Sequence, residues 1–378
     1  MKILIVGAGI GGLTLAAFLK ESSIEYDIVE KANNWNTQGF SIGLWNNGRH
    51  ILAKLGILDR LEKEGTHIKR YQVRNGKGDL IREYDFFKLY AKYGLSYTQI
   101  NRAFLHSWLL ELVGKENIQL GVQVNSLKDV GHGVEVVLSN GQTHTYDLVV
   151  GADGIHSKIR GMIFGSELEK FDNWRVWYAW VDNQFKDEAT VTEYVEPGEF
   201  IGIFDSCGKT LAVLIAPVEH TVWDDVKGRL GRLSETFKHE VRLDGFLKGL
   251  KDEDVMPTDL SRVTLKKFVK GRVVLAGDAA HGFEPNAGLG ASMAMEDGYV
   301  LAAELMKVSG TYTIKKAIDR YQDLRRKRVK VARSSTSRMR SWSFIGPRWL
   351  RKTVDFFLPF VPQPLFTSQY LKLMKEEI

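Results

Sequence analysis

The feature that most constrains this 378-residue chain is a glycine-rich stretch within its first dozen residues. An unbroken apolar run, "KILIVGAG", predicts a buried parallel strand, and "GLTLAAFLKESS" after it predicts a helix. A second strand, "YDIVEK", follows and carries Glu30 near its end. Together these elements form a βαβ unit, with the pattern Gly-x-Gly-x-x-Gly at its first turn. The sequence therefore predicts an α/β fold of the Rossmann type.

Each glycine of this pattern has a physical task in binding a dinucleotide. Gly7 makes the tight turn, Gly9 lets the backbone approach a pyrophosphate, and Gly12 lets the helix pack against the strand. The helix that begins near Gly11 presents free N–H groups to the phosphates. Glu30 is placed to accept hydrogen bonds from ribose hydroxyls, and it would repel a 2′-phosphate. The sequence therefore predicts FAD or NAD at this turn, and not NADP.

Composition excludes several other kinds of protein. The apolar fraction is 44% and the charged fraction is 26%, as in ordinary globular proteins. The one cysteine, Cys207, allows no intrachain disulfide and no cysteine-based metal site, and the nine histidines have no metal-ligand spacing, so we expect no metal. No signal-peptide pattern and no apolar run of about 18 residues is present, which favours a cytoplasmic protein.

Positive charge is concentrated near the C-terminus. Eleven Lys and Arg residues and no Asp or Glu lie between Arg325 and Lys352, together with Trp342, Phe344 and Trp349. The favoured interpretation is the solvated basic face of a C-terminal helix. The alternative is a peripheral contact of residues 325–352 with an anionic membrane surface or a partner. Nucleic acid is not expected, because no nucleic-acid motif accompanies this terminal run.

Two later stretches resemble motifs of class A FAD-dependent monooxygenases, which have the para-hydroxybenzoate hydroxylase fold. "DLVVGADGIHSKIR" resembles that family's Asp-Gly motif, with Asp153 and Gly154 in the expected places. "GDAAHGFEPNAGLGASMAMEDG" resembles its Gly-Asp motif, with Asp278 as the acid. The resemblance covers most of residues 1–165 and 270–325.

The resemblance implies FAD as the cofactor and assigns contacts to it. Asp278 is expected to bind the ribityl chain, and the loop after the proline is expected to lie along the flavin and pyrophosphate. Leu289 and Ser292 depart from the family, because they replace amide side chains, and Lys31 cannot form the planar fork of the arginine frequent there. Asp153 and Asp278 can each also be read as simple helix caps. Beyond the first turn, the expected FAD contacts are Lys31, Arg102, Asp153, Gly154, Asp278, Pro285, Gly288, Leu289 and Gly290.

The resemblance also implies a reaction. NAD(P)H reduces FAD, the reduced flavin adds O₂ at C4a, and the resulting hydroperoxide passes one oxygen atom to a substrate. A single Gly-x-Gly-x-x-Gly indicates that NAD(P)H is a transient co-substrate. We expect a monooxygenase acting on an apolar aromatic or polyketide-like small molecule. Two alternatives are a flavin-dependent reductase of the same fold and a non-catalytic FAD-binding interaction protein with a membrane-associated basic C-terminus. No catalytic acid or base is assigned, and His281 is expected to be structural.

Between the motifs the chain changes character. Recurring strand-like runs over residues 172–268 predict a mostly antiparallel sheet, so the domains interleave along the chain. A substrate pocket is expected between this sheet and the flavin, although aromatic residues in a sheet are more often plain core. The expected lining residues are Trp45, Trp177, Tyr194, Phe204 and Phe283. The expected units are an FAD-binding domain (1–70, 100–170 and 270–325), a substrate-binding sheet domain (71–99 and 171–269) and a C-terminal helical segment (326–378).

Overall fold

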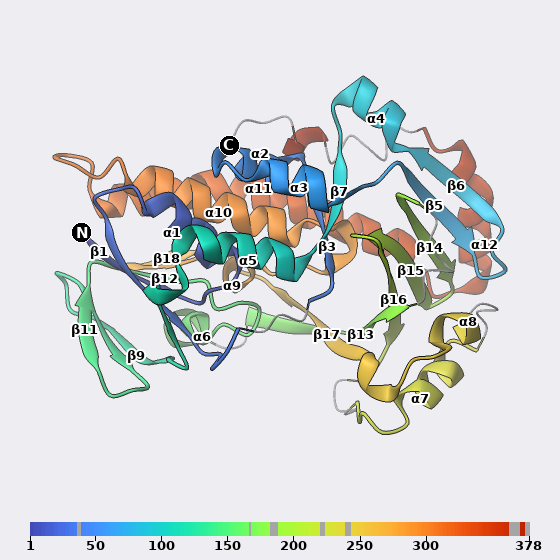
Figure 1. Cartoon of the computed structure of the whole chain (residues 1–378), viewed down its shortest axis with the longest axis horizontal. Helices are drawn as coiled ribbons and strands as arrows, with labels where there is room; N and C mark the ends of the chain where they lie inside the picture. The colour runs from blue at the N-terminus through green and yellow to red at the C-terminus, as the bar shows by residue number, and fades with distance from the viewer. Residues whose placement is uncertain are drawn as a thin grey trace.

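The computed structural model divides into two lobes that share long helices (Figure 1). One lobe, which carries the N-terminus, is built on a parallel sheet, and the other on a larger, mostly antiparallel sheet. This arrangement confirms the α/β fold class with an antiparallel sheet inserted into it. The structure describes residues 1–35, 39–165, 168–181, 188–219, 224–238, 243–362 and 371–374.

The first lobe is organised around a six-stranded sheet. All neighbouring strands run parallel except the first pair, which is antiparallel. Val6 pairs with both Val29 and Gly151, and Gly151 pairs with Leu275, so four strands end at the same level. The segments that follow these strands therefore meet at one edge, where open α/β sheets bind ligands. In order across the sheet the strands are β18 (Val269–Lys270), β19 (Val273–Leu275), β12 (Leu148–Gly151), β1 (Lys2–Val6), β2 (Glu25–Glu30) and β8 (Ile118–Leu120).

Helices cover this sheet. Two of the longest, α10 and α11, lie side by side, and α10 also packs closely on α1 (Figure 1). That packing requires Gly298, since a Cβ there would lie 2.7 Å from the Leu15 nitrogen. The helices of this lobe are α1 (Ile10–Leu19), α5 (Arg102–Val113), α6 (Lys158–Phe164), α9 (Asp278–His281), α10 (Gly290–Leu305) and α11 (Ile314–Ser343).

The second lobe holds a seven-stranded sheet, antiparallel except for one parallel pair, β14 with β5. Its side chains alternate between two faces, as the pleat of a sheet requires. One face packs under α7 (Arg229–Thr236) and α8 (Leu243–Leu247), and the other turns toward the first lobe. In order the strands are β17 (Met256–Val263), β13 (Glu169–Val181), β16 (Lys209–Pro217), β15 (Glu199–Ser206), β14 (Thr190–Glu196), β5 (Arg70–Asn75) and β6 (Leu80–Asp85).

The lobes meet at a three-stranded sheet made of β3 (Ser41–Trp45), β7 (Tyr97–Asn101) and β4 (Thr66–His67). Beside it, the rings of Phe40 and Tyr178 stack with centroids 4.3 Å apart. Two short helices follow β3: α2 (Asn46–Lys54) and α3 (Leu58–Glu64). They separate at Gly56, which has a left-handed backbone with φ of +72°.

The remaining elements lie at the edges of the two lobes. A hairpin around Gly141 is formed by β10 and β11. None of the helices in the described part of the chain is both long and apolar enough to cross a membrane. These elements are β9 (Val124–Asp129), β10 (Val134–Leu138), β11 (Thr143–Tyr146), α4 (Phe86–Tyr93), η1 (Lys115–Asn117), η4 (Asp252–Asp254), η5 (Pro285–Ala287), α12 (Arg348–Phe357) and η6 (Leu358–Phe360).

Candidate functional site

The glycine-rich turn between β1 and α1 is closed by backbone packing. Gly7 has φ of +107°, and a Cβ there would lie 2.5 Å from the Ala152 carbonyl oxygen. A Cβ on Gly12 would lie 2.1 Å from the Gly7 carbonyl oxygen, so no side chain fits. Gly9, by contrast, has no atom within 4 Å of a Cβ position. The turn is therefore tight where the helix meets the strand and open where a ligand would approach.

Glu30, at the end of β2, fastens this turn from the side. One carboxylate oxygen accepts from the Ala8 N–H at 2.9 Å, and the other accepts from the Ala32 N–H at 3.0 Å. His106 of α5 completes the support, because its Nε2 lies 2.8 Å from the Ala8 carbonyl oxygen and is placed to donate to it. Burial lowers the pKa of His106, which favours the neutral ring. Each Glu30 oxygen keeps further acceptor capacity for a ribose hydroxyl. Lys31 is exposed beside this acid and lies outside the cavity described below.

The segment after β12 lines the cavity with backbone atoms, while the side chain of its acidic residue, Asp153, binds the start of a helix. Asp153 accepts from the Ile159 N–H at 3.1 Å and from the Ser157 hydroxyl, at the start of α6. Ser157 is the N-cap of that helix, which begins at Lys158. The capping interpretation therefore describes the Asp153 side chain. Gly154, with φ of +83°, lines the cavity.

Asp278 is the first residue of α9, and its carboxylate opens into the cavity. No hydrogen bond to that carboxylate is made by the part of the chain that the structure describes. Burial raises the pKa of Asp278, against the opposing effects of His281 and Arg102. Arg102 also lines the cavity, so an acid and a base face the same space without a direct ion pair between them. Such groups are suited to a polar ligand that carries hydroxyl groups and phosphates.

A buried ion network holds Asp278 in place. Asp297 of α10 accepts from the Gly277 N–H at 2.6 Å, lies 2.6 Å from His281 Nε2, and accepts from Arg325 Nε at 2.5 Å. Arg325 is fully buried in α11 and also binds Glu296. Although burial works to raise it, the pKa of Asp297 falls to about 2 because His281 and Arg325 favour the charged form. His281 therefore orients the motif, as a structural residue would.

The loop before α10 completes this side of the site. Gly288 has φ of +59°, and a Cβ there would lie 2.9 Å from the Tyr97 hydroxyl. Gly290 begins α10 and lines the cavity together with Pro285. Leu289 is 2% exposed within the core. The replacement of an amide by Leu289 therefore places an apolar side chain in the core, and only its main chain is left for a ligand.

One cavity of about 560 Å³ joins Gly9, Arg102, Gly154, Asp278 and Gly290 to the second lobe, while Glu30 and Leu289 are not among its lining residues. Its far wall is the inner face of the seven-stranded sheet, and Trp45 closes one side by donating from Nε1 to the Ala287 carbonyl at 3.0 Å. Among the expected lining residues, Trp45, Phe204 and Phe283 lie at this cavity. The rest of the apolar wall includes Phe40, Tyr178, Phe200, Leu211, Val213, Ile215, Met339 and Phe344.

The expected positions of Trp177 and Tyr194 need correction. Both point to the opposite face of the sheet, into the apolar cluster under α7 and α8. Trp177 donates from Nε1 to Asp224 at 2.8 Å, and the Tyr194 ring lies 6.1 Å from that of Phe246. Because successive residues of a strand face opposite sides, the neighbouring Tyr178 and Glu193 face the cavity instead.

Sequence reasoning missed a polar group on the apolar wall. Glu193 of β14 is 7% exposed and lines the cavity, and the neighbouring Tyr71 side chain interacts with it. Burial raises its pKa to about 7. Close by, Gln99 donates to the Tyr97 hydroxyl at 3.0 Å and accepts from the Ser41 hydroxyl at 2.5 Å. The sequence "TVTEYV" did contain a signal, because Glu193 lies two residues from Val191 and from Val195 and therefore faces the same side of the strand as both valines.

A second missed group closes the rim. Glu284, in the loop before η5, accepts from Arg340 of α11 at 2.8 Å. Burial and the nearby Asp172 carboxylate raise the pKa of Glu284 to about 7. Phe344, just after α11, reaches the same cavity, and its ring lies 4.5 Å from that of Trp174. The C-terminal helix therefore supplies part of the pocket wall.

The geometry fits FAD on several counts. The open space over Gly9, the helix N-terminus at Gly290, and the unmatched Asp278 and Arg102 side chains all face one elongated cavity. Among the described residues, no three His, Cys, Asp or Glu side chains gather as a metal site would need.

Comparison with known proteins agrees with this geometry. The chain is 29% identical over 335 residues to aurachin C monooxygenase/isomerase of Stigmatella aurantiaca, covering 87% of this chain and 86% of that protein. It is 28% identical over 338 residues to FAD-dependent urate hydroxylase of Klebsiella pneumoniae, covering 87% of each. The structure of Klebsiella pneumoniae HpxO with FAD and uric acid superposes with a TM-score of 0.89, at 24% identity, covering 99% of this chain and 97% of that one.

These relatives are a monooxygenase and a hydroxylase, which favours a monooxygenase over the reductase and the non-catalytic protein. The family model described as FAD binding domain matches residues 1–336. The chain therefore belongs to this FAD-binding family of class A FAD-dependent monooxygenases.

Proposed function

We propose that this protein oxygenates an apolar aromatic or polyketide-like small molecule, using FAD, O₂ and NAD(P)H as a transient electron donor. The observation that supports this most strongly is the single cavity, which connects a dinucleotide-type turn to an aromatic wall. A substrate on that wall would lie beside the part of the cavity lined by Asp278 and Gly290. Apolar and aromatic walls with few polar groups are typical of small-molecule sites.

We assign the cofactor contacts as follows. The turn at Gly7, Gly9, Gly11 and Gly12 and the N-terminus of α1 would hold the pyrophosphate. Glu30 would bind the adenosine ribose through the lone pairs that its backbone contacts leave free, with Lys31 exposed beside it. The remaining contacts, along the ribityl chain and flavin, are Arg102, Gly154, Asp278, Pro285, Gly288, Leu289 and Gly290, with Asp153 acting indirectly through α6.

Within this proposal the two lobes divide the work. FAD, when bound, supplies the electron transfer and oxygen chemistry, and the protein supplies position and electrostatics. The parallel-sheet lobe (1–70, 100–170 and 270–325) would hold the cofactor, and the other sheet (71–99 and 171–269) would hold the substrate. The aromatic wall would exclude water, which protects the reactive oxygen from side reactions.

The decisive experiment combines a visible spectrum with isotope labelling. The purified protein should show the yellow absorbance of FAD, and one compound in an aromatic and polyketide panel should stimulate NADH or NADPH oxidation under air. With ¹⁸O₂, the product should gain one labelled oxygen atom. Stimulated oxidation without label in any product would overturn the monooxygenase proposal.

We also propose a peripheral membrane contact, centred on α12 and η6 and not on the part of residues 325–352 that belongs to α11. Within that run, Arg325 and Arg328 are buried against Glu296, and Arg340 binds Glu284. The exposed apolar surface lies further on, where Trp349, Phe356 and Phe360 of α12 and η6 are 72%, 67% and 73% exposed. Trp349 and Phe356 are seven residues apart on α12 and so share one side of it, and the Phe360 ring of η6 lies 6.3 Å from that of Phe356.

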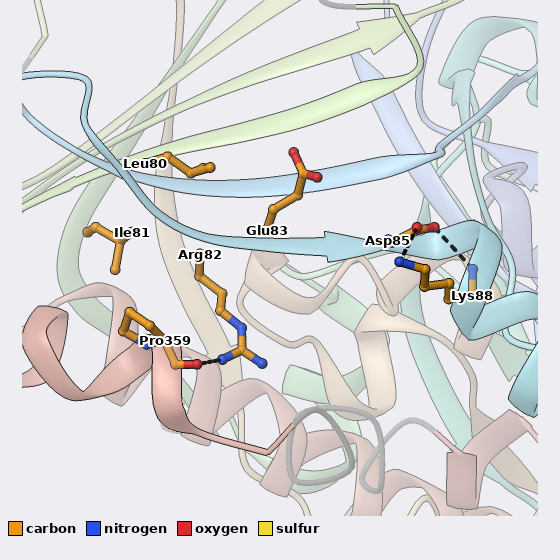
Figure 2. Close-up of a pocket in the computed structure, with 7 residues that line it drawn as sticks. All are labelled: Leu80, Ile81, Arg82, Glu83, Asp85, Lys88 and Pro359. Carbon is orange, nitrogen blue, oxygen red and sulfur yellow. Dashed lines mark hydrogen bonds and ion pairs between the residues drawn. The ribbon is translucent and has the colours of Figure 1, made fainter.

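The surroundings of this aromatic face match an anionic lipid surface. Lys352 of α12 is exposed between the aromatic residues. Arg82 of β6 donates to the Leu358 and Pro359 carbonyls and fixes the segment, in a hollow where Lys88 is paired with Asp85 (Figure 2). Exposed aromatic residues next to lysines are typical of helices that lie in the headgroup region of a membrane.

Vesicle flotation tests this contact. The wild-type protein should float with vesicles of phosphatidylcholine and phosphatidylglycerol, and not with phosphatidylcholine alone. The double variant Phe356→Ser/Phe360→Ser should lose flotation, while Phe104→Ser/Met306→Ser, at exposed positions elsewhere, should keep it. Equal flotation of wild type and the α12 variant would remove the proposal. Deleting residues 325–378 is not a usable test, because it removes the buried Arg325.

A further inference from the structure

We propose that Glu193 selects the substrate: its carboxyl group takes an N–H or O–H donor of a neutral aromatic ring, and it excludes aromatic carboxylates from the sheet end of the cavity. This inference rests on the proposed function and deepens it by naming a substrate class. It also assigns a recognition role to a residue that neither the glycine motifs nor the basic tail contains.

The first argument is the position of Glu193 on the sheet. It lies in one row across the inner face, between Val73 of β5 and Gly202 of β15, with Val213 and Tyr178 next in the same row. Of this row, Glu193, Val213 and Tyr178 line the cavity. A ligand resting on this wall would therefore meet apolar and aromatic surface with one carboxyl group in it.

The second argument is that Glu193 has acceptor capacity to spare. Tyr71 of β5 is its polar neighbour on the adjacent strand, and a carboxyl group can accept several hydrogen bonds. The other titratable groups that face it are Tyr97 of β7 and, less strongly, Tyr84 of β6, and burial raises the pKa of both phenols. No described Lys or Arg forms an ion pair with Glu193. The remaining lone pairs face the cavity, where a ligand donor would satisfy them.

The third argument is the contrast with the other cavity carboxylates. Glu284 is bound by Arg340, and Asp278 lies near Arg102 at the opposite lobe. Glu193 faces the phenols of Tyr71, Tyr97 and Tyr84, and no described Lys or Arg forms an ion pair with it. Arg82, in the same row on β6, donates instead to the Leu358 and Pro359 carbonyls. Above about pH 7, where Glu193 is ionised, an aromatic carboxylate placed beside it would bring two like-charged groups together in a dry site, which disfavours binding. A neutral phenol or ring N–H would instead form a hydrogen bond to a buried acceptor.

Three matched naphthalenes test this selection. The FAD-loaded protein would be titrated with 2-naphthol, 2-methoxynaphthalene and 2-naphthoate, and binding would be followed by the change in the visible flavin band. Wild type should bind 2-naphthol at least about tenfold more tightly than its methyl ether, since a hydrogen bond to a charged group contributes about 1.5–3 kcal/mol. It should bind 2-naphthoate most weakly.

Variants at one position identify the group responsible. Glu193→Val should bind 2-naphthol and the ether alike and should gain affinity for 2-naphthoate. Glu193→Gln keeps a hydrogen-bond acceptor, so it should retain part of the preference for 2-naphthol. It loses the negative charge, so it should also gain affinity for 2-naphthoate. Glu196→Gln is the matched control, because Glu196 lies on the same strand outside the cavity and accepts from the Gly76 N–H at 2.8 Å.

Several results would overturn the inference. Equal binding of 2-naphthol and its ether by wild type would do so, as would no binding of any of the three. An unchanged preference in both Glu193 variants, checked for equal FAD content, would also overturn it. These outcomes are independent of the proposed function, whose failure would appear as missing ¹⁸O in the product even where the binding preference is present.

Discussion

At the scale of single residues, the glycine turn separates the demands of packing from those of ligand approach. Gly12→Ala should lower the free energy of unfolding by at least about 2 kcal/mol, with or without FAD, because its Cβ would meet the Gly7 carbonyl at 2.1 Å. Gly9→Ala should leave the stability of the FAD-free protein unchanged but weaken FAD binding, since only a ligand would meet the new methyl group.

Urea unfolding of both variants, with FAD present and removed, checks this prediction. The two glycines act as their own matched controls, because they differ by three positions in one turn. A Gly9→Ala variant that loses stability without FAD would show that this position also serves packing.

The role of Asp278 is testable through cofactor occupancy. Asp278→Ala should weaken FAD binding by about tenfold or more, because a hydrogen bond to a charged acceptor contributes about 1.5–3 kcal/mol. The ratio of absorbance at 450 nm to that at 280 nm in the purified protein reports this directly. Asp129→Asn, at the exposed end of β9, serves as the control. Unchanged absorbance in Asp278→Ala would remove the assigned contact.

Glu193 should also make the free energy of unfolding depend on pH. Burial raises its pKa from 4.5 to about 7, so the folded protein binds a proton more tightly than the unfolded chain does. Its contribution to the free energy of unfolding is therefore fully present below pH 4.5 and is lost as pH rises toward 7. The loss is on the order of 3 kcal/mol, at about 1.4 kcal/mol per pKa unit.

Glu193→Gln should remove this slope, because the amide does not titrate. Urea unfolding of the FAD-loaded wild type and variant, below and above that pH window, makes the comparison. Parallel pH profiles for the two proteins would contradict the buried, cation-free environment of this carboxyl.

The limits of sequence reasoning are clearest at these same residues. The glycines, Glu30 and Asp278 could be predicted because each has a local backbone reason for its place. Trp177 and Tyr194 were expected at the pocket, but each strand carries bulky residues at both alternations, so the pattern does not say which face is buried by α7 and α8. If the other face of β14 is assigned to the cavity, Tyr194 takes the place of Glu193 there.

At the scale of elements, buried ion pairs between α10 and α11 fix the position of the Gly277-Asp278 motif. Arg325→Met should lower the free energy of unfolding by about 3–5 kcal/mol, because it leaves Glu296 and Asp297 buried with less compensation. The folded pKa of Asp297, lowered from 3.8 to about 2, means that its stabilising effect is present above pH 3.8 and is lost as pH falls toward 2.

Calorimetry of wild type and Arg325→Met across the acid range, with FAD content measured in parallel, tests this network. Arg326→Met is the matched control, since Arg326 is exposed one residue along the same helix. A similar loss in both variants would mean that the helix itself, and not the buried ion pair, was disturbed.

The same helix shows what a charge pattern can and cannot predict. The basic run was expected to be solvated, and α11 does expose Arg326, Lys327, Lys330 and Arg338. Its other face buries Arg325 and Arg328, because "AMED" in α10 supplies the acids opposite them. Sequence shows both sets of charges, but which of them meet depends on how the two helices pack.

At the scale of the whole molecule, the cavity belongs to neither lobe alone. Residues that follow three strands of the parallel sheet, β1, β12 and β19, form one wall, and the inner face of the seven-stranded sheet forms the other. The end of α11 closes the rim, with Arg340 bound to Glu284 and Phe344 beside Trp174. The chain therefore needs both lobes in register before a substrate can be shielded from water.

Opening this rim should uncouple the reaction. Phe344→Ala removes a ring that lies 5.9 Å from Phe200 and 4.5 Å from Trp174, so water should enter the cavity. Electrons from NAD(P)H would then reduce O₂ to hydrogen peroxide without oxygen reaching the substrate. We expect NAD(P)H oxidation to continue while the ratio of hydrogen peroxide to oxygenated product rises severalfold.

Peroxide and product assays on the same reaction measure that ratio. Phe357→Ala is the matched control, because Phe357 is 57% exposed on α12 and leaves the rim intact. If Phe344→Ala lowered NAD(P)H oxidation and product together, with no added peroxide, Phe344 would act in substrate binding and not as a barrier to water. A raised ratio in Phe344→Ala alone would show that the C-terminal helix keeps water out of a site built mainly by the rest of the chain.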